Sequence, residues 1–581
     1  MLLSLIGTPL VAQRSPPSGP AAALHALFDA EWDYTMEQRP TWASQLGDRR
    51  GNDRWEDVSL AAFERRFEHN QEVLSRLRGI SRGELSAADR LNHELFEKQY
   101  ETAVEEHSWR WHLLPLNQRG GIQTADEIAD ALRFETLKDY EDWIARLRAF
   151  PTYMEQTIEL MREGVRARMV HAKVVMERVP AQIDKQIVAE PGLSPFFKPF
   201  EKFPDTIAES EQDRLRESAK EAIAAGVIPA FRGFKKFFNG EYLPGCFDSA
   251  GAWQHPDGEA LYAFFARKHT STKLTPREIH ETGLREVERL KGRMEAIKEE
   301  IGFRGTLQEF FEFVRTEPRF HHESPDELLE AYRALAKRID PLLVKVFKTL
   351  PRMPYGVEPI PENIAPDTTT AYYRPPAADG SRAGTFFVNL YKPETRLTFE
   401  MTALALHEGM PGHHLQIALA FEQGDIPKFR RHGSYTSFVE GWGLYAEKLG
   451  YEMGLYEDPL PRFGQLTYEM WRAVRLVVDT GIHARRWDRQ KAIDYFLEHA
   501  AKSELDVVNE VDRYISWPGQ ALAYKIGELK IQELRARAQK ALGDRFDLRE
   551  FHEVVLKSGP VPLDILEREV TDWIFGQLLR R

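Results

Sequence analysis

Residues 404–416 have the sequence LALHEGMPGHHLQ, and this stretch sets the expectations for the rest of the chain. In the H-E-x-x-H zinc motif, two histidines four residues apart share one helix face, and the glutamate between them handles a water proton. Here the fourth residue after His407 is Pro411, and the next histidines come six and seven residues after His407. Six residues of unbroken helix rise about 9 Å, too far for two nitrogens that each lie about 2 Å from one ion. We therefore expect Pro411 and Gly412 to break the helix.

A histidine after the break and a glutamate further on complete a candidate metal site. His413 is the preferred second ligand, and His414 is the alternative. Glu440 follows His413 by 27 residues, across a short loop that lets the next helix return past the metal. Two histidines, one glutamate and an open fourth position are typical of catalytic zinc. The competing interpretation is a group of ordinary core histidines around a kink, but so many ligand types in so few residues favour a metal.

Two more glutamates flank these candidates. Glu408 directly follows His407 and is the candidate general base, because a purely structural metal site does not need an uncoordinated carboxylate beside its ligand. Glu447 lies seven residues after Glu440, two turns along the same helix face. We expect Glu447 to support a ligand or to form a salt bridge.

Helical signals dominate on both sides of this motif. Thr275-Pro276-Arg277-Glu278 and Ser324-Pro325-Asp326-Glu327 each place a capping residue before a proline at the first helical position. Amphipathic spacing and composition predict helices over residues 85–105, 137–168, 209–238, 396–423 and 436–453.

One region departs from the helical pattern. Prolines and glycines cluster over residues 351–393, where residues 384–391 have strand composition and Asp379-Gly380 marks a turn. We therefore expect a mainly α fold with one small β-sheet beside the metal helix. Helices from both halves are expected to wall a deep cleft, with the strand at its edge.

The organisation predicted from these elements is a single helical domain over residues 21–579. Its N-terminal helical part covers about 21–350, its metal-site part about 351–535, and its C-terminal helices about 536–579. Residues 1–20 are predicted to be a signal peptide or a disordered N-terminus. The apolar run MLLSLIGTPLVA resembles the core and cleavage end of a secretory signal, although the basic start is missing. Export to the periplasm or the medium is favoured, and a cytoplasmic location is the alternative.

Composition narrows the classes of partner. The 581 residues include 78 Lys and Arg against 90 Asp and Glu, a net charge of −12. An acidic chain without a basic run argues against nucleic acid or an anionic membrane as the main partner. The single cysteine, Cys246, excludes an internal disulfide and a cysteine-rich metal cluster. No later run reaches about 18 apolar residues, so no integral membrane segment is expected.

A second group of candidates lies in residues 513–527, RYISWPGQALAYKIG. Polar and aromatic side chains around a Pro-Gly break can be aimed into a cleft. Tyr524, with Tyr514 as second choice, is the candidate donor to a developing oxyanion, and Arg513 is the candidate for binding a substrate carboxylate. The alternatives are interface aromatics and an internal salt bridge.

Three polar residues upstream share one helix face. Arg475, Asp479 and His483 are spaced at i, i+4 and i+8 in an otherwise apolar run. This stripe is either a buried network that orients a ligand or a ladder on the protein surface.

Four stretches of this sequence carry a family resemblance: HEGMPGHHLQ, FVEGWGLYAEKLG, RLVVDTGIHARRW and WPGQALAYKIGELKIQELR. They resemble the bacterial family called domain of unknown function 885 (DUF885), over nearly the whole chain from about Ala21. That family is grouped with the helical gluzincin peptidases, so the resemblance implies a helical, zincin-like metallopeptidase.

Two stretches also resemble characterised peptidases. Phe438-Val439-Glu440 is similar to the segment that supplies the glutamate ligand in thimet-oligopeptidase-like enzymes, and residues 513–527 are similar to the tyrosine-bearing segment of carboxypeptidase Taq-like enzymes. The Pro-Gly insertion departs from the usual motif and puts the choice of second histidine in question.

The combined prediction is a zinc metallopeptidase of the oligopeptidase or carboxypeptidase type. It is expected to hold Zn²⁺ and to cleave amide bonds of short peptides, with Glu408 as general base. A zinc amidohydrolase acting on a non-peptide amide and a non-catalytic binding protein whose metal shapes a pocket are the alternatives.

Overall fold

The computed structural model describes residues 19–580 except 363–364, 366–368, 378–379, 381 and 425. The candidate signal segment and Asp379 of the expected turn lie outside the described residues. Helices make up most of the described chain and a single three-stranded sheet accompanies them, which confirms the mainly α class. None of the helices in that part of the chain combines the length and hydrophobicity that crossing a bilayer requires.

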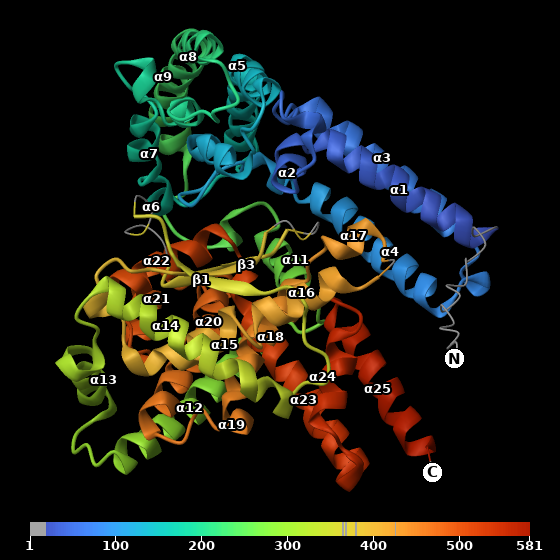
Figure 1. Cartoon of the computed structure of the whole chain (residues 1–581), viewed down its shortest axis with the longest axis vertical. Coiled ribbons are helices and arrows are strands. Elements are labelled where there is room, and N and C mark those ends of the chain that lie inside the picture. Colours follow the sequence, from blue (N-terminus) through green and yellow to red (C-terminus); the bar gives the residue numbers. More distant parts are fainter. Residues whose placement is uncertain are drawn as a thin grey trace, which may run out of the picture.

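The N-terminal helices form an elongated arm along one side of the molecule (blue in Figure 1). Apolar residues of the first, third and fourth helices pack together in a small core of their own. The helix predicted over 85–105 is α4, and Ser86 begins it by accepting a hydrogen bond from the backbone N–H of Asp89. The arm consists of α1 (Pro20–Gln38), α2 (Pro40–Gln45), α3 (Leu60–Arg78) and α4 (Ala87–Ser108).

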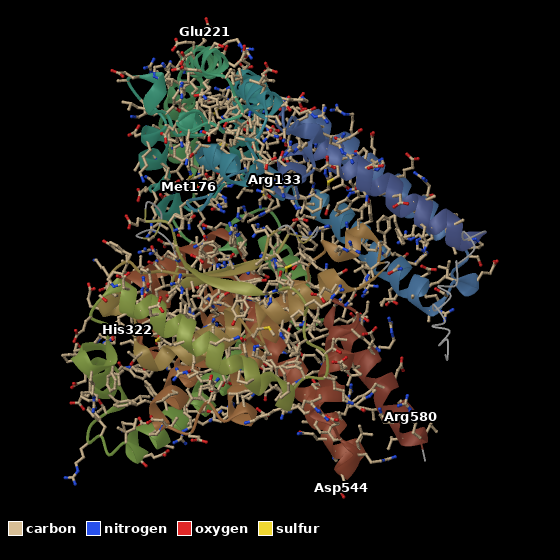
Figure 2. The ribbon with its side chains drawn as sticks, viewed as in Figure 1. Arg133, Met176, Glu221, His322, Asp544 and Arg580 are labelled. Carbon is tan, nitrogen blue, oxygen red and sulfur yellow. The ribbon has the colours of Figure 1, made fainter. Side chains whose placement is uncertain are left out.

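A second group of helices forms the lobe at the top of Figure 1. The predicted helices over 137–168 and 209–238 are both present; the second continues from α8 into α9 through a π-helical turn at Ile223–Val227. Figure 2 shows Glu221 at the far end of this lobe and Met176 at its base. Its helices are α5 (Leu137–Ala167), α6 (Lys173–Met176), α7 (Val179–Lys185), α8 (Glu209–Ala222), α9 (Ile228–Phe237) and α10 (Leu243–Gly245).

The remaining helices build the large lower body. Both predicted caps begin helices there: Thr275 accepts from the N–H of Glu278, and Ser324 from that of Glu327. One continuous apolar core runs from the upper lobe into this body. The central pair is α12 (Pro276–Glu300) and α20 (Pro459–Ala484), which pack along each other. Around them lie α11 (Gly258–Thr270), α13 (Leu307–Thr316), α14 (Pro325–Ile339), α21 (Arg489–His499), α22 (Glu504–Ser516), α23 (Ala523–Leu542), α24 (Leu548–Leu556) and α25 (Leu563–Leu579).

The sheet corrects one expectation. Its strands are β1 (Tyr355–Pro359), β2 (Ala371–Arg374) and β3 (Gly384–Val388), in the order β1-β3-β2. The predicted strand is therefore β3, but it is the central strand, paired parallel to β1 and antiparallel to β2. All five of its residues are buried. The expectation of an open strand edge beside a cleft is therefore wrong, because both edges of β3 are already hydrogen-bonded to neighbouring strands.

Candidate metal centre

The predicted helix over 396–423 is broken at the expected place. It consists of α15 (Met401–Glu408) and α16 (His413–Glu422), separated by a loop in which the backbone of Gly409 and Gly412 is neither helical nor extended. A Cβ atom on Gly412 would overlap the carbonyl oxygens of Leu406 and His407, so only glycine fits there. The indole N–H of Trp442 donates to the carbonyl oxygen of Pro411 at 2.9 Å. The loop is thereby fixed to the next long helix, α18 (Thr436–Lys448).

The break brings three side chains to one point. His407 Nε2 lies 3.7 Å from Glu440 Oε2, and His413 Nε2 lies 3.5 Å from the same oxygen. One ligand atom from each of these residues lies within 4.8 Å of the others. The two imidazole rings stand nearly perpendicular, at 86°, with their centroids 4.7 Å apart. His407 ends α15, His413 begins α16 and Glu440 lies on α18, so three helices supply one residue each.

His414 is turned away from this point. Its Nδ1 is 2.8 Å from the hydroxyl of Tyr373 on β2, and its Nε2 is 2.9 Å from the carbonyl oxygen of Met353. Burial lowers the pKa of His414 to about 4, so the ring is neutral at physiological pH. Both ring nitrogens are thus engaged in joining α16 to the sheet.

Neighbouring residues hold the two converging histidines in place. His407 Nδ1 is 2.8 Å from Glu447 Oε1, and the Glu447 side chain is completely buried. Glu447, which the sequence analysis expected to support a ligand, therefore does contact the candidate ligand His407. On the other face of the His407 ring lies Gly443, where an added Cβ would come within 2.9 Å of Nε2. His413 Nδ1 is 2.9 Å from the amide of Gln416, which also donates to the carbonyl oxygen of Val439.

The electrostatics of the site favour a cation. Burial alone would lower the pKa of His407, but the hydrogen-bonded carboxylates of Glu440 and Glu447 raise it to about 9. Burial likewise opposes ionisation of Glu440, yet the two histidines hold the pKa of this carboxyl well below its usual range. Both carboxylates thus stabilise positive charge at this point.

The separations of both histidine nitrogens from the glutamate oxygen fit zinc. In a tetrahedral zinc site with bonds of about 2.0–2.1 Å, neighbouring ligand atoms are about 3.3 Å apart. The 3.5 and 3.7 Å separations come within a few tenths of an ångström of that value. The nitrogens and the carboxylate oxygen are also donor types that zinc prefers.

Glu408 directly follows His407 as the last residue of α15, and its side chain is partly exposed. A cavity of about 1280 Å³ borders the start of α18 at Ser434, Tyr435 and Thr436. His407, His413 and Glu440 are not among its lining residues, and Glu440 follows one turn after Thr436. The cavity is walled mainly by α1, α4, α11 and α23.

The second group of candidates is gathered around Glu510. Tyr514 is buried, and its hydroxyl donates to Glu510 at 2.7 Å while accepting from Arg475 Nε at 3.0 Å. Arg513 donates to Glu510 at 3.2 Å and to the hydroxyl of Tyr524 at 3.2 Å. The guanidinium of Arg475 lies over the Tyr524 ring, 4.4 Å from its centroid. The predicted residues therefore do meet, in a salt-bridged network that includes Arg475.

The stripe on α20 is buried, so the surface-ladder alternative is wrong. Asp479 accepts from the hydroxyl of Tyr262 at 2.6 Å and from the backbone N–H of Gly519 at 3.1 Å. His483 Nε2 is 2.9 Å from the carbonyl oxygen of Tyr514. Together with Arg475, these residues anchor the end of α22 and the turn into α23, and so position Arg513 and Tyr524.

Sequence reasoning missed several members of these groups. Glu510 had a usable signal, because it lies three and four residues before Arg513 and Tyr514 on one helix face. Arg472, 3.8 Å from Glu447 Oε1, likewise lies one turn before Arg475. Gln416 had the same kind of signal, because it lies three residues after His413 on α16. Gly443 had none, because its contact with His407 depends on which helices meet in space.

Comparison with known proteins places the chain in a family. Residues 40–570 match the model of the family described as "Bacterial protein of unknown function (DUF885)". The chain belongs to this family. No functionally curated protein matches it.

Two solved structures resemble this DUF885 protein over almost its whole length. One is described as "the putative lipoprotein from Colwellia psychrerythraea", with 30% identity and a TM-score of 0.90, covering 96% of this chain and 100% of the other. The second, "a putative lipoprotein of unknown function from Shewanella oneidensis", has 17% identity and a TM-score of 0.72, covering 95% and 99% of the two chains. At that identity the second structure shows a shared fold alone.

Proposed function

We propose that this DUF885 protein is a zinc-dependent hydrolase that cleaves amide bonds of short peptides. The observation that carries the proposal is the convergence of His407 Nε2, His413 Nε2 and Glu440 Oε2 at zinc-ligand spacing, with Glu408 next in the chain. A structural zinc site usually has four protein ligands, whereas three ligands leave a position for water or substrate.

Each residue has a distinct role in the proposed reaction. A zinc ion held by the three ligands would supply Lewis acidity and a bound water of lowered pKa. Glu408 takes up the proton of the attacking water at its carboxylate and returns it to the leaving amine. Glu447 fixes the tautomer and orientation of His407 through their 2.8 Å hydrogen bond.

Tyr524 is the better candidate for stabilising the oxyanion. The Tyr514 hydroxyl already donates to Glu510, so its proton is committed. The Tyr524 hydroxyl accepts from Arg513, which leaves its own O–H to donate. Tyr524 was also the first choice from the sequence, ahead of Tyr514.

Two observations support short peptides as substrates and an exported location. A cavity of about 1280 Å³ borders the helix that carries Glu440, which exceeds the roughly 300–1,000 Å³ of typical small-ligand pockets and suits a peptide of several residues. The deep cleft and the gluzincin relationship remain part of this proposal. Export is supported by the 30%-identical solved structure, which is described as "the putative lipoprotein from Colwellia psychrerythraea".

The direct test combines metal analysis with a peptide digest. The purified protein is expected to contain about one zinc per chain and to cut a mixture of short peptides, while leaving a stably folded protein intact. Efficient digestion of the folded protein would contradict an enclosed site. Zinc at full occupancy with no peptide cleaved would move the assignment to a non-peptide amide, and no bound metal would overturn the proposal.

A further inference from the structure

An excess of positive charge surrounds the Glu510 carboxylate on α22. The guanidinium groups of Arg475 and Arg513 both bond to one carboxylate, Glu510, at 2.9 and 3.2 Å. The two arginine side chains are only 5% and 11% exposed. Arg119 comes from the loop before the upper lobe, and its guanidinium lies over the ring of Trp517. Its charge interacts electrostatically with both Arg513 and Glu510. We call these three arginines the arginine cluster.

Part of this cluster has no partner among the described residues. Arg475 Nη1 and Arg513 Nε are buried nitrogens without a hydrogen-bond acceptor. A buried donor without a partner is destabilising, and a buried unpaired charge more so. Arg489 on the adjoining helix α21 offers a contrast, because it bonds Asp512 through two nitrogens at 2.6 and 3.1 Å.

The acidic groups nearby do not balance the cluster. The guanidinium groups of Arg475 and Arg513 share the single carboxylate of Glu510, and Arg119 adds a third positive charge nearby. Burial would raise the pKa of Glu510, but the adjacent Arg475 and Arg513 lower it to about 2. Asp479, one turn along α20 from Arg475, also interacts with the charge of Arg513, but desolvation raises the pKa of its carboxyl to about 7. It therefore carries less than a full negative charge at neutral pH. The cluster retains positive charge that an anionic ligand would neutralise.

Two chains of contacts connect the arginine cluster to the metal ligands. His407 contacts Glu447, which lies 3.8 Å from Arg472, and Arg475 follows Arg472 by one turn of α20. On the other side, Gly441 next to Glu440 lies against Gly527, and Tyr524 precedes Gly527 by one turn of α23. Arg475 and Arg513 both contact Tyr524. The arginine cluster and the metal ligands therefore belong to one connected set of contacts.

We propose that the arginine cluster recognises the free C-terminal carboxylate of the peptide, so that the protein acts near the carboxyl end of its substrates. Guanidinium forks match carboxylates in a bidentate geometry, which favours this anion class. The exposed Arg119 and Trp517 mark the open side, and Arg475 the deep end. The inference rests on the proposed function for the link to catalysis, but carboxylate binding is measurable without it.

The test measures binding to the zinc-free protein by calorimetry, using N-acetyl-Ala-Phe with a free carboxylate and the same dipeptide as its C-terminal amide. The acid is expected to bind at least about tenfold more tightly than the amide, the effect of one charge-assisted hydrogen bond. Arg119→Gln should reduce this preference severalfold and Arg475→Gln should abolish it. Arg485→Gln, at an exposed position after α20, should leave it unchanged.

Several outcomes would overturn the inference. Equal affinity for acid and amide would do so, as would a preference that survives both Arg119→Gln and Arg475→Gln. Inorganic phosphate is the third probe, and phosphate binding as tightly as the acid would indicate a general oxyanion site instead. If Arg475→Gln does not fold, the inference is still tested by comparing acid and amide binding in the wild type and in the Arg119→Gln variant, whose substitution is at an exposed position. A clear acid preference in a zinc-loaded protein that cleaves no peptide would contradict the proposed function alone, whereas equal cleavage of acid and amide peptides would contradict this inference alone.

Discussion

Glu408 and His407 are adjacent in sequence but differ in environment. His407 is buried and held by Glu447, whereas Glu408 is partly exposed at the end of α15. Glu408→Gln keeps the shape of the side chain but cannot accept a proton. We expect this variant to retain zinc and to lose about 10²–10⁴ in turnover, as general bases typically contribute.

The measurement for this variant is single-substrate kinetics together with elemental analysis. Glu394→Gln, at an exposed position upstream of α15, is the matched control and should keep full activity. A Glu408→Gln protein that retains more than about a tenth of the wild-type turnover would exclude Glu408 as the general base.

His413 and His414 are neighbours with opposite surroundings. His413 faces Glu440, and His414 is bonded on both nitrogens to Tyr373 and Met353. We expect His413→Ala to lose zinc with little change in the fold. His414→Ala should keep zinc but lower the free energy of unfolding by about 1–3 kcal/mol, because its buried partners lose their hydrogen bonds.

Elemental analysis and thermal unfolding of both variants separate these effects. The assignment of the second ligand fails if His414→Ala loses zinc while His413→Ala retains it. If neither variant loses metal, the three-residue site itself is wrong.

The helices α18 and α23 cross at closest approach through a pair of glycines. Gly441 and Gly527 lie in direct contact, and a Cβ atom on Gly527 would overlap the carbonyl oxygen of Ser437. This crossing fixes α18, which carries Glu440, against α23, which begins with Ala523 and Tyr524. The distance between the metal ligand and the phenol is therefore set by two residues that have no side chain.

Gly527→Ala should push these helices apart. Overpacking in a close contact typically costs about 1–3 kcal/mol, so we expect a lower melting temperature and weaker zinc binding. Gly292→Ala is the control, because Gly292 lies in α12 with open space around it; there alanine should be neutral or stabilising by about 0.5–1 kcal/mol. Equal melting temperatures for the two variants would show that the glycine contact does not set the crossing.

Asp479 connects three parts of the molecule, because it lies on α20 and accepts from Tyr262 on α11 and from Gly519 before α23. Burial raises the pKa of its carboxyl to about 7 in the folded protein, against about 3.9 in an unfolded chain. Between these values the folded state binds more protons than the unfolded state. The contribution of Asp479 to stability is therefore present at low pH and is lost as the pH rises from about 4 to about 7.

Asp479→Asn should remove this dependence. The difference in unfolding free energy between the wild type and this variant is expected to fall as the pH rises through that range, measured by denaturant titration at fixed ionic strength. Comparison with the variant cancels the contributions of other titrating groups. A difference that stays constant from about pH 4 to pH 7 would contradict the burial of an uncharged carboxyl at this position.

What the sequence determined by itself rests on local backbone chemistry. The helix over 137–168, the Thr275 cap and the break at Pro411-Gly412 follow from helical periodicity, side-chain capping and the conformations of proline and glycine, which act within a few residues. The same local logic placed Glu447 near the ligands, since two turns of helix keep one face.

Only the tertiary structure decided the rest, because it depends on which distant segments meet. His414 is turned away from the metal ligands because it is hydrogen-bonded to Tyr373, 41 residues earlier, and to the carbonyl oxygen of Met353, 61 residues earlier. The predicted strand is central and not an edge because β1 and β2 both pair with it, a matter of sheet order that composition does not encode. Arg119 and Arg513 are almost four hundred residues apart in sequence, yet their charges lie close enough to interact. No pattern along the chain signals this proximity. Convergence of this kind is set by how the helices pack, which is a property of the whole molecule.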